Sequence, residues 1–175
     1  MKQALAAPRL QSVPILRNGV KYSKRRIIAA IRHEAEILIR EGRLARTKEF
    51  IQHSDMTVFQ HVCHVAYMSC VLSMELGIDV NYRELIRGAL LHDYFLYDWH
   101  KGKHPDFGHA FGHPGRALRN ALRDYKLTER EVQIIRHHMW PLTVIPPTCR
   151  EAWLVIAADK ICTFLEVIRK ERVRL

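Results

Sequence analysis

Apolar residues recur every three or four positions along most of the chain, which is the spacing of an amphipathic helix. This pattern predicts helices over residues 23–42, 45–53, 57–76, 82–94, 113–124, 128–139 and 149–171. Asn81 and Thr128 stand where two of these ranges begin and have the side chains of helix N-caps, and Glu131 completes a capping box with Thr128. Because no stretch of useful length alternates apolar and polar residues, we expect an all-α fold.

Two segments lack the helical pattern. Residues 1–23 contain Pro8, Pro14 and Gly19 and predict an extended basic arm, followed by one helical domain over residues 24–175. Residues 95–112 are rich in Gly, His, Asp and Lys and predict a loop. In the last predicted helix, the side chains expected to face the core are Leu154, Ala158, Ile161, Leu165 and Ile168.

Length and composition indicate one globular domain. The chain has 175 residues, of which 48% are apolar and 26% are charged, and a domain of this size buries roughly 70% of its unfolded surface. No apolar run approaches the roughly 18 residues of a membrane span, and Pro8 and Pro14 interrupt the region where a signal peptide needs an apolar segment. The four cysteines form no CxxC pair, which favours reduced thiols in a cytoplasmic protein that contacts no membrane.

Positive charge is concentrated near the N-terminus. The chain has 28 basic and 18 acidic residues, and residues 1–50 contain twelve of the basic and four of the acidic ones. A basic segment is typical of contact with nucleic acid or another anionic surface, but this one lacks the interleaved aromatic residues of a nucleic-acid platform. A solvated arm and a positive field that attracts phosphorylated substrates are the other two interpretations.

Histidine is the unusual residue of the composition, because nine of the eleven histidines lie between His61 and His138. The residues of interest lie within or beside apolar helical segments: His61, His64, His92, Asp93, His109, His113, His137, His138 and Asp159. Any one of them alone would suggest a core salt bridge or a satisfied hydrogen bond, but their joint occurrence favours a metal ion as the common partner. Imidazole with carboxylate suits one or two divalent transition metals, namely Fe, Mn, Co, Ni or Zn.

The same residues resemble the motifs of a known family. The runs HVCHVA (61–66), LLHD (90–93), HP (113–114), HH (137–138) and AADK (157–160) are similar, in this order, to the HD superfamily of metal-dependent phosphohydrolases, over about residues 57–168. This resemblance implies an all-helical domain of the HD type. The implied ligands of a first metal are His61, His92, Asp93 and Asp159.

Family members with additional histidines hold a second metal, and the resemblance implies His113, His137 and His138 as its ligands, with Asp93 as the bridge. His109 competes with His113 for this place, and we prefer His113 because HP followed by a small residue is common in the family. His64 is expected to be structural or to support a ligand. The residues after the HD pair, Tyr94-Phe95-Leu96, depart from the Ile-Gly that is common there.

A two-metal site of this kind implies hydrolysis of a phosphoester or phosphoanhydride, because the metals activate a water and neutralise developing charge. The expected substrate is a small phosphorylated molecule such as a nucleotide. The residues expected to take part in catalysis are Asp93, Lys160 as a cation and His104 as a general acid. The residues expected to bind substrate are Lys101, Lys103 and Arg116, with Trp140 stacking on a base or forming a wall of the site.

Several other functions stay open at the level of sequence. Small proteins with this motif order resemble symmetrical dinucleoside tetraphosphate hydrolases, and a nucleoside monophosphate phosphatase is a further alternative. A cyclic-dinucleotide phosphodiesterase has less support, because its glycine-tyrosine-proline element is missing. The family also includes two-iron oxygenases, and a non-catalytic module that binds RNA or a partner around a structural metal is the alternative outside enzymes. An oligomer is compatible with all of these.

Overall fold

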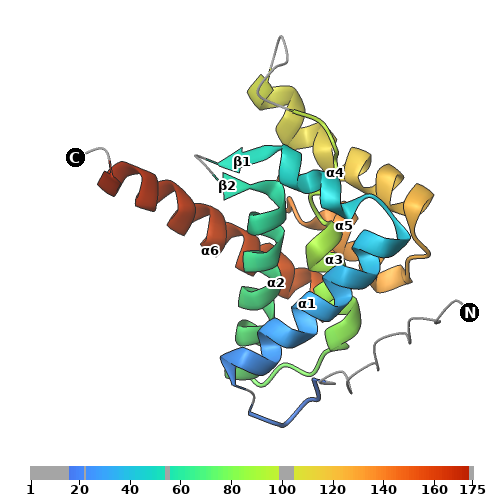
Figure 1. The fold of residues 1–175 in the computed structure, drawn as a ribbon, viewed down its shortest axis with the longest axis vertical. Helices are drawn as coiled ribbons and strands as arrows, with labels where there is room; N and C mark the ends of the chain where they lie inside the picture. Colours follow the sequence, from blue (N-terminus) through green and yellow to red (C-terminus); the bar gives the residue numbers. More distant parts are fainter. Residues whose placement is uncertain (1–15, 22, 54–55, 99–104, 174–175) are drawn as a thin grey trace, which may run out of the picture.

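The computed structural model describes residues 16–21, 23–53, 56–98 and 105–173, which form an almost entirely helical protein (Figure 1). Its elements in chain order are α1 (Lys24–Glu41), the 3₁₀ helix η1 (Leu44–Glu49), β1 (Ile51–His53), β2 (Met56–Thr57), α2 (Val58–Glu75), α3 (Tyr82–Leu91), α4 (Pro105–Asp124), α5 (Glu129–His137) and α6 (Arg150–Val173). The prediction of an all-α fold is confirmed, with one short hairpin as the exception.

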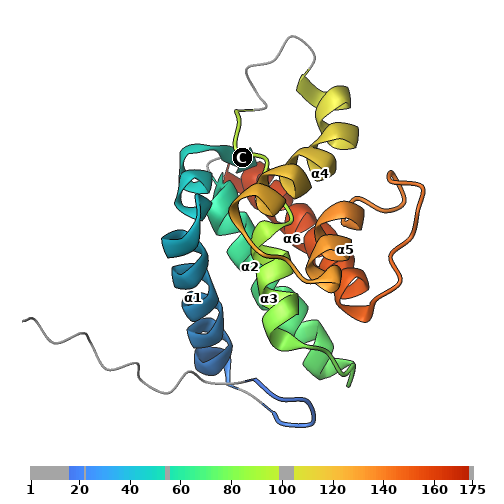
Figure 2. The same ribbon diagram turned by 90° about the vertical axis from the view of Figure 1, so that its right-hand side faces the viewer.

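Helices α2 and α3 form the centre of the molecule. Helix α2 packs against α3 and α6, α5 packs against α3 and α6, and α1 contacts both central helices (Figures 1 and 2). The core between them consists of fully buried apolar side chains, among them Leu38, Val62, Leu85, Leu90 and Ile134. Burying one such side chain stabilises the folded state by about 1.5–3 kcal/mol, so this core holds the helices in place around the site described below.

Side-chain caps fix where the central helices begin. Asn81 caps α3 by accepting a hydrogen bond from the backbone N–H of Glu84, and Thr128 forms a capping box with Glu131 at α5, so both predicted caps are confirmed. Thr57 forms a second capping box at the start of α2 with the residue three positions later. Each cap satisfies backbone donors that the first turn of a helix leaves unpaired.

The single helix predicted over residues 45–53 is wrong. Residues 44–49 form η1, and the chain then extends into β1, which pairs antiparallel with β2 with Ile51 opposite Thr57. Strands of three and two residues are too short to produce a recognisable alternating pattern. The hairpin leads directly into α2, and it therefore holds β1 beside the first turns of that helix.

The loop predicted over residues 95–112 is wrong in its second half, because α4 begins at Pro105. Proline is favoured in the first turn of a helix, where its missing N–H costs nothing. The arm predicted over residues 1–23 is described at residues 16–21 and 23, and the rest of it lies outside the described residues. There, Leu16 is buried, and the Asn18 side chain forms hydrogen bonds of 3.1 Å with both the N–H and the carbonyl of Val80.

Helix α6 is only partly packed. Leu154 and Ala158 are buried as predicted, but Ile161 and Leu165 are 38% and 54% exposed, so the predicted inward face is wrong at these two positions. Figure 1 shows the reason: the C-terminal part of α6 extends past α2. The apolar spacing of a helix cannot indicate where its neighbours end. Among the described residues, no helix is long and apolar enough to cross a membrane.

Candidate metal centre

Five helices each bring a histidine or an aspartate to one region of the core. The residues that meet there are His61 on α2, His92 and Asp93 directly after α3, His113 on α4, His138 directly after α5, and Asp159 on α6. Each of them is at most 9% exposed. The convergence follows from the fold, because α6 packs against both central helices, α5 packs against α3 and α6, and α4 packs against α5.

The first group of ligand atoms comes from α2, α3 and α6. Asp159 Oδ1 lies 3.1 Å from His61 Nε2 and 3.7 Å from His92 Nε2. Asp93 Oδ2 faces the same two nitrogens, at 3.4 Å from His92 Nε2 and 3.9 Å from His61 Nε2. Two imidazole nitrogens and two carboxylate oxygens therefore face one another.

The other oxygen of Asp93 faces a second pair of histidines. Asp93 Oδ1 lies 3.2 Å from His113 Nε2 and 3.5 Å from His138 Nε2. These two ring nitrogens are 2.7 Å apart. Asp93 thus stands between two histidine groups, with one carboxylate oxygen directed to each.

The outer ring nitrogens of His92 and His138 fix the orientation of both rings. Nδ1 of His92 donates to the carbonyl of Ala89 at 2.7 Å, and Nδ1 of His138 donates to the carbonyl of Ile135 at 2.9 Å. A carbonyl can only accept, so the proton of each neutral ring is on Nδ1 and the inward Nε2 carries a lone pair. This is the tautomer that binds a metal through Nε2.

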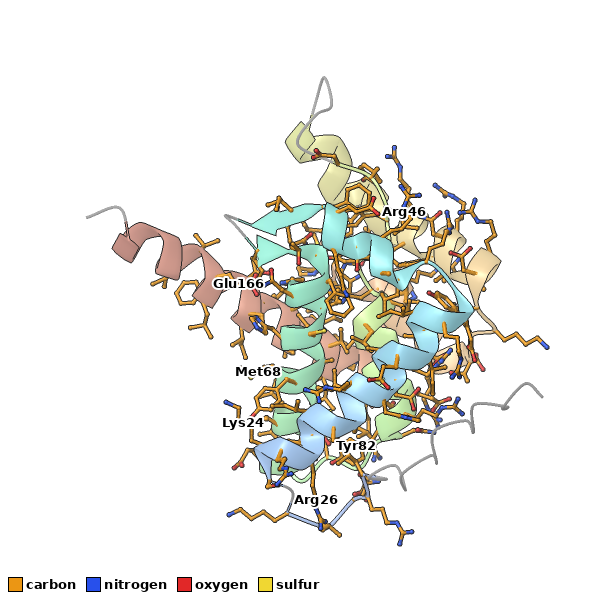
Figure 3. The ribbon with its side chains drawn as sticks, in the orientation of Figure 1. Lys24, Arg26, Arg46, Met68, Tyr82 and Glu166 are labelled. Atoms are coloured by element: carbon orange, nitrogen blue, oxygen red, sulfur yellow. The ribbon has the colours of Figure 1, made fainter. Side chains whose placement is uncertain are left out.

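Glu166 fixes the orientation of the His61 ring in the same way, by contacting its outer nitrogen, and the sequence analysis missed this residue. Its two carboxylate oxygens lie 3.2 and 3.0 Å from His61 Nδ1, and Figure 3 shows Glu166 beside α2. His64 is mostly exposed, with its Nδ1 3.6 Å from Glu166, which agrees with a supporting position. The spacing could have identified Glu166, because it follows Asp159 by two helical turns and shares its face of α6.

Gln52 is the second residue that the sequence analysis missed. It lies on β1, is 7% exposed, and donates a hydrogen bond of 2.7 Å from Nε2 to Asp93 Oδ2. Its oxygen, Oε1, is buried without a hydrogen-bond partner among the described residues. A single glutamine in a three-residue strand gives no sequence signal of such a position.

The charges of the centre shift the pKa values of its histidines in opposite directions. Burial opposes protonation of His61, but hydrogen bonds to Asp159 and Glu166 outweigh burial and raise the pKa of His61 to about 9. Burial, together with the nearby His113 and His92, lowers the pKa of His138 to about 3. For Asp159, burial opposes ionisation, but the hydrogen bond with His61 and the charges of the nearby His92 and His61 rings outweigh it and hold the pKa below its ordinary value. The centre therefore contains ionised carboxylates that need a positive charge beside them.

The donor set fits a divalent transition metal. His61, His92 and Asp159, and likewise His92, Asp93 and His138, form groups whose ligand atoms lie within 4.8 Å of one another. Within the part of the chain that the structure describes, His92 Nε2 and Asp93 Oδ1 are buried without a hydrogen bond. A nitrogen lone pair and a carboxylate at such distances repel each other unless a cation or a proton lies between them, and mixed imidazole and carboxylate ligation suits Mn, Fe, Co, Ni or Zn.

His137, the other predicted ligand of the adjacent pair, is in neither group of ligand atoms among the described residues. Neighbouring residues on a helix point roughly 100° apart, so His137 and His138 cannot both face the centre from the end of α5. Burial and the positive charge of Arg136 lower the pKa of His137 and outweigh a backbone hydrogen bond with Ile145 that raises it. The structure therefore places His138, and not His137, among the six converging residues.

The predicted substrate residues are described in part. Arg116 is stacked over the ring of Tyr97, 4.8 Å from its centre, one turn beyond His113. Lys160 donates a hydrogen bond of 2.9 Å to the carbonyl of Trp140, whose ring packs edge-on against Trp153 at 4.9 Å. The predicted residues Lys101, Lys103 and His104, and the side chain of His109, lie outside the described residues.

Comparison with protein families gives one match that covers most of the chain. The model of the HD domain matches residues 58–163, from the start of α2 into α6, and this range contains all six converging residues. Comparison with curated proteins gave no match, and comparison with solved structures gave none either.

Proposed function

The chain belongs to the HD-domain family of metal-dependent phosphohydrolases, and we propose that it hydrolyses a phosphoester or phosphoanhydride bond in a small nucleotide-like substrate. The observation that supports this most directly is the position of Asp93. One of its oxygens faces His61 and His92, and the other faces His113 and His138. A carboxylate in this position is suited to bridge two metal ions.

Two metals, when bound, would lower the pKa of a water and neutralise charge on a phosphate. The first would be held by His61, His92, Asp159 and Asp93 Oδ2, and the second by His113, His138 and Asp93 Oδ1. The protein supplies the geometry: the hydrogen bonds on Nδ1 of His61, His92 and His138 keep each Nε2 directed inward. Such support typically changes metal affinity or activity by about 10- to 100-fold.

Arg116 is the described cation that we assign to the substrate phosphate. It is exposed, lies one turn after His113 on α4, and is held against Tyr97. A guanidinium presents paired donors that match the geometry of phosphate oxygens. Lys160 instead donates to the carbonyl of Trp140, and we assign the stacking of a nucleobase to Trp140, whose ring packs against Trp153.

Turnover of a substrate panel tests the proposal. The purified protein, loaded with Mn²⁺ or Co²⁺, is incubated with p-nitrophenyl phosphate, nucleoside monophosphates and diadenosine tetraphosphate, and released product is measured. We expect hydrolysis of at least one of them, and the Asp93→Ala variant is expected to lose both metal and activity. Preference for the dinucleotide would identify the symmetrical tetraphosphate hydrolase among the alternatives.

The matched control is Asp79→Ala, which removes an exposed aspartate outside the converging residues. This variant is expected to keep its metal and its activity. The proposal is contradicted if the metal-loaded protein hydrolyses none of the phosphates, or if Asp93→Ala is as active as the unchanged chain.

A further inference from the structure

Gln52 is buried at the metal centre, and among the described residues only one end of its amide has a hydrogen-bond partner. Strand β1 points it inward, because Ile51 before it is 38% exposed whereas Gln52 is 7% exposed. The strand is held to the start of α2 by a hydrogen bond of 2.9 Å from the Val58 N–H to the Phe50 carbonyl. The hairpin therefore places the amide against Asp93 from outside the helical bundle.

The hydrogen bond to Asp93 determines which way the amide points. An ionised carboxylate can only accept, so the Gln52 atom that lies 2.7 Å from Asp93 Oδ2 is the amide nitrogen. The amide oxygen, Oε1, is then the end that is buried without a partner among the described residues. A buried acceptor without a donor is destabilising. A hydrogen-bond donor that binds at the centre together with the metal would remove this cost.

The chemistry of the neighbouring atoms indicates what that donor is. His92 Nε2 and Asp93 Oδ1 are also buried without a hydrogen bond to any described residue, but a neutral imidazole nitrogen and a carboxylate oxygen are ligands for a transition metal. The Gln52 amide oxygen beside these two atoms is a hydrogen-bond acceptor, so its partner must be a donor such as an O–H group. A water on the metals would present such a group beside Asp93.

We propose that Gln52 is a positioning residue for hydrolysis: Nε2 keeps one oxygen of Asp93 directed at each histidine group, and Oε1 accepts a hydrogen bond from the attacking water. This inference rests on the proposed function. The water oxygen forms the new bond to phosphorus with a lone pair, and the bond to the leaving oxygen breaks with its electron pair. One water proton ends on the leaving oxygen, and the O–H that Gln52 holds stays on the released phosphate.

Replacement of Gln52 by methionine, which has a similar length and no amide, tests both contacts. For Gln52→Met, we expect the affinity for Mn²⁺ alone, measured by calorimetry, to fall about tenfold, because Asp93 loses its donor. With p-nitrophenyl phosphate and saturating Mn²⁺, kcat is expected to fall by about 10- to 100-fold while KM changes little. Gln52→Asn keeps an amide but is one methylene shorter, so it is expected to lose kcat similarly, and it replaces Gln52→Met if that variant does not fold.

Gln133→Met is the matched control. Both ends of the Gln133 amide are paired with Thr148, at 2.7 and 2.9 Å, and neither residue is among the converging ligands. This variant is expected to keep the Mn²⁺ affinity and kcat of the unchanged chain. An unaltered kcat in Gln52→Met would overturn the inference, and so would complete loss of Mn²⁺ binding, which would make Gln52 a ligand. Failure of the unchanged chain itself to bind Mn²⁺ or to release product would instead overturn the proposed function.

Discussion

At the scale of single residues, the centre concentrates polar groups that an apolar core would normally exclude. His61 and His92 have no exposed surface, and Asp93 is 3% exposed. Uncompensated burial of one carboxylate costs several kcal/mol or shifts the group to its neutral form. Here the outer nitrogens of the histidines are tied to Glu166 and to backbone carbonyls, so the inner atoms keep their positions and are available to a cation.

Glu166 is expected to support metal binding through His61. Glu166→Gln removes the negative charge but keeps the size of the side chain, so His61 loses basicity while the packing of α6 is retained. We expect the affinity for Mn²⁺ to fall by about 10- to 100-fold, measured by calorimetry, with little change in the unfolding temperature of the metal-free protein. Glu75→Gln, at an exposed position of α2, is the control, and equal affinities for the two variants would contradict the prediction.

Metal affinity is expected to rise with pH. The pKa of His61 is raised to about 9, so below that pH a metal must displace a proton from Nε2, and binding releases protons. The pKa of His138 is lowered to about 3, so this ring is neutral at neutral pH and adds no competition there. Calorimetric titrations with Mn²⁺ between about pH 6 and pH 8 measure the effect. An affinity that is constant over this range, or that falls as pH rises, would count against it.

Residue types and the family resemblance predicted all six converging residues but not the residues that support them. His92 and Asp93 are adjacent and lie in an apolar segment, so their burial could be expected from the sequence. The support of Asp93 by Gln52 depends on a hairpin whose strands have three and two residues, and its existence is decided by tertiary packing. Whether His137 or His138 faces the centre depends on how α5 is rotated about its axis relative to the core. Two adjacent histidines in a sequence do not show this rotation.

At the scale of helices, the close approach of α3 and α5 depends on Gly88. A Cβ atom added at Gly88 would clash with Ile134 Cδ1 and would lie 3.0 Å from two further atoms of that side chain. This contact matters for the centre because the His92–Asp93 pair directly follows α3 and His138 directly follows α5.

Gly88→Ala is therefore expected to destabilise the protein. Alanine gains about 1 kcal/mol of helix propensity over glycine, but overpacking against Ile134 costs about 1–3 kcal/mol, so a net loss of about 1 kcal/mol is expected in denaturant unfolding. The Ile134→Val background removes the closest atom and should reduce this loss. Gly115→Ala, whose added Cβ would meet only Arg119 at 3.7 Å, is the control. A Gly88→Ala variant more stable than the unchanged chain would contradict the tight contact.

Helix positions were predictable where the sequence contained both the helical spacing of apolar residues and the capping residues. Asn81 and Thr128 fixed the starts of α3 and α5 because a cap is a local interaction that the sequence contains in full. The exposed end of α6 was not predictable in this way, because Ile161 and Leu165 continue the apolar spacing beyond the point where neighbouring helices end. The spacing of apolar residues shows which face of a helix is apolar. Only the fold shows whether other helices cover that face.

At the scale of the whole molecule, the fold brings together residues that are far apart in the chain. His61 and Asp159 are separated by 98 positions, yet their side chains lie 3.1 Å apart. Each of five helices contributes to the centre, so a bound metal would tie these helices together and stabilise the folded state by the free energy of binding. The basic excess of the chain, 28 against 18 acidic residues, would favour the approach of an anionic phosphate to such a centre.

Anomalous diffraction from crystals grown with Mn²⁺ tests the central claim most directly. Two peaks are expected roughly 3.5–4 Å apart, one within ligand distance of His61, His92, Asp159 and Asp93 Oδ2, and the other beside Asp93 Oδ1, His113 and His138. Crystals of the Asp93→Ala variant are expected to lack both peaks. A map with no peak among these side chains, at full Mn²⁺ saturation and neutral pH, would contradict the assignment of a metal centre.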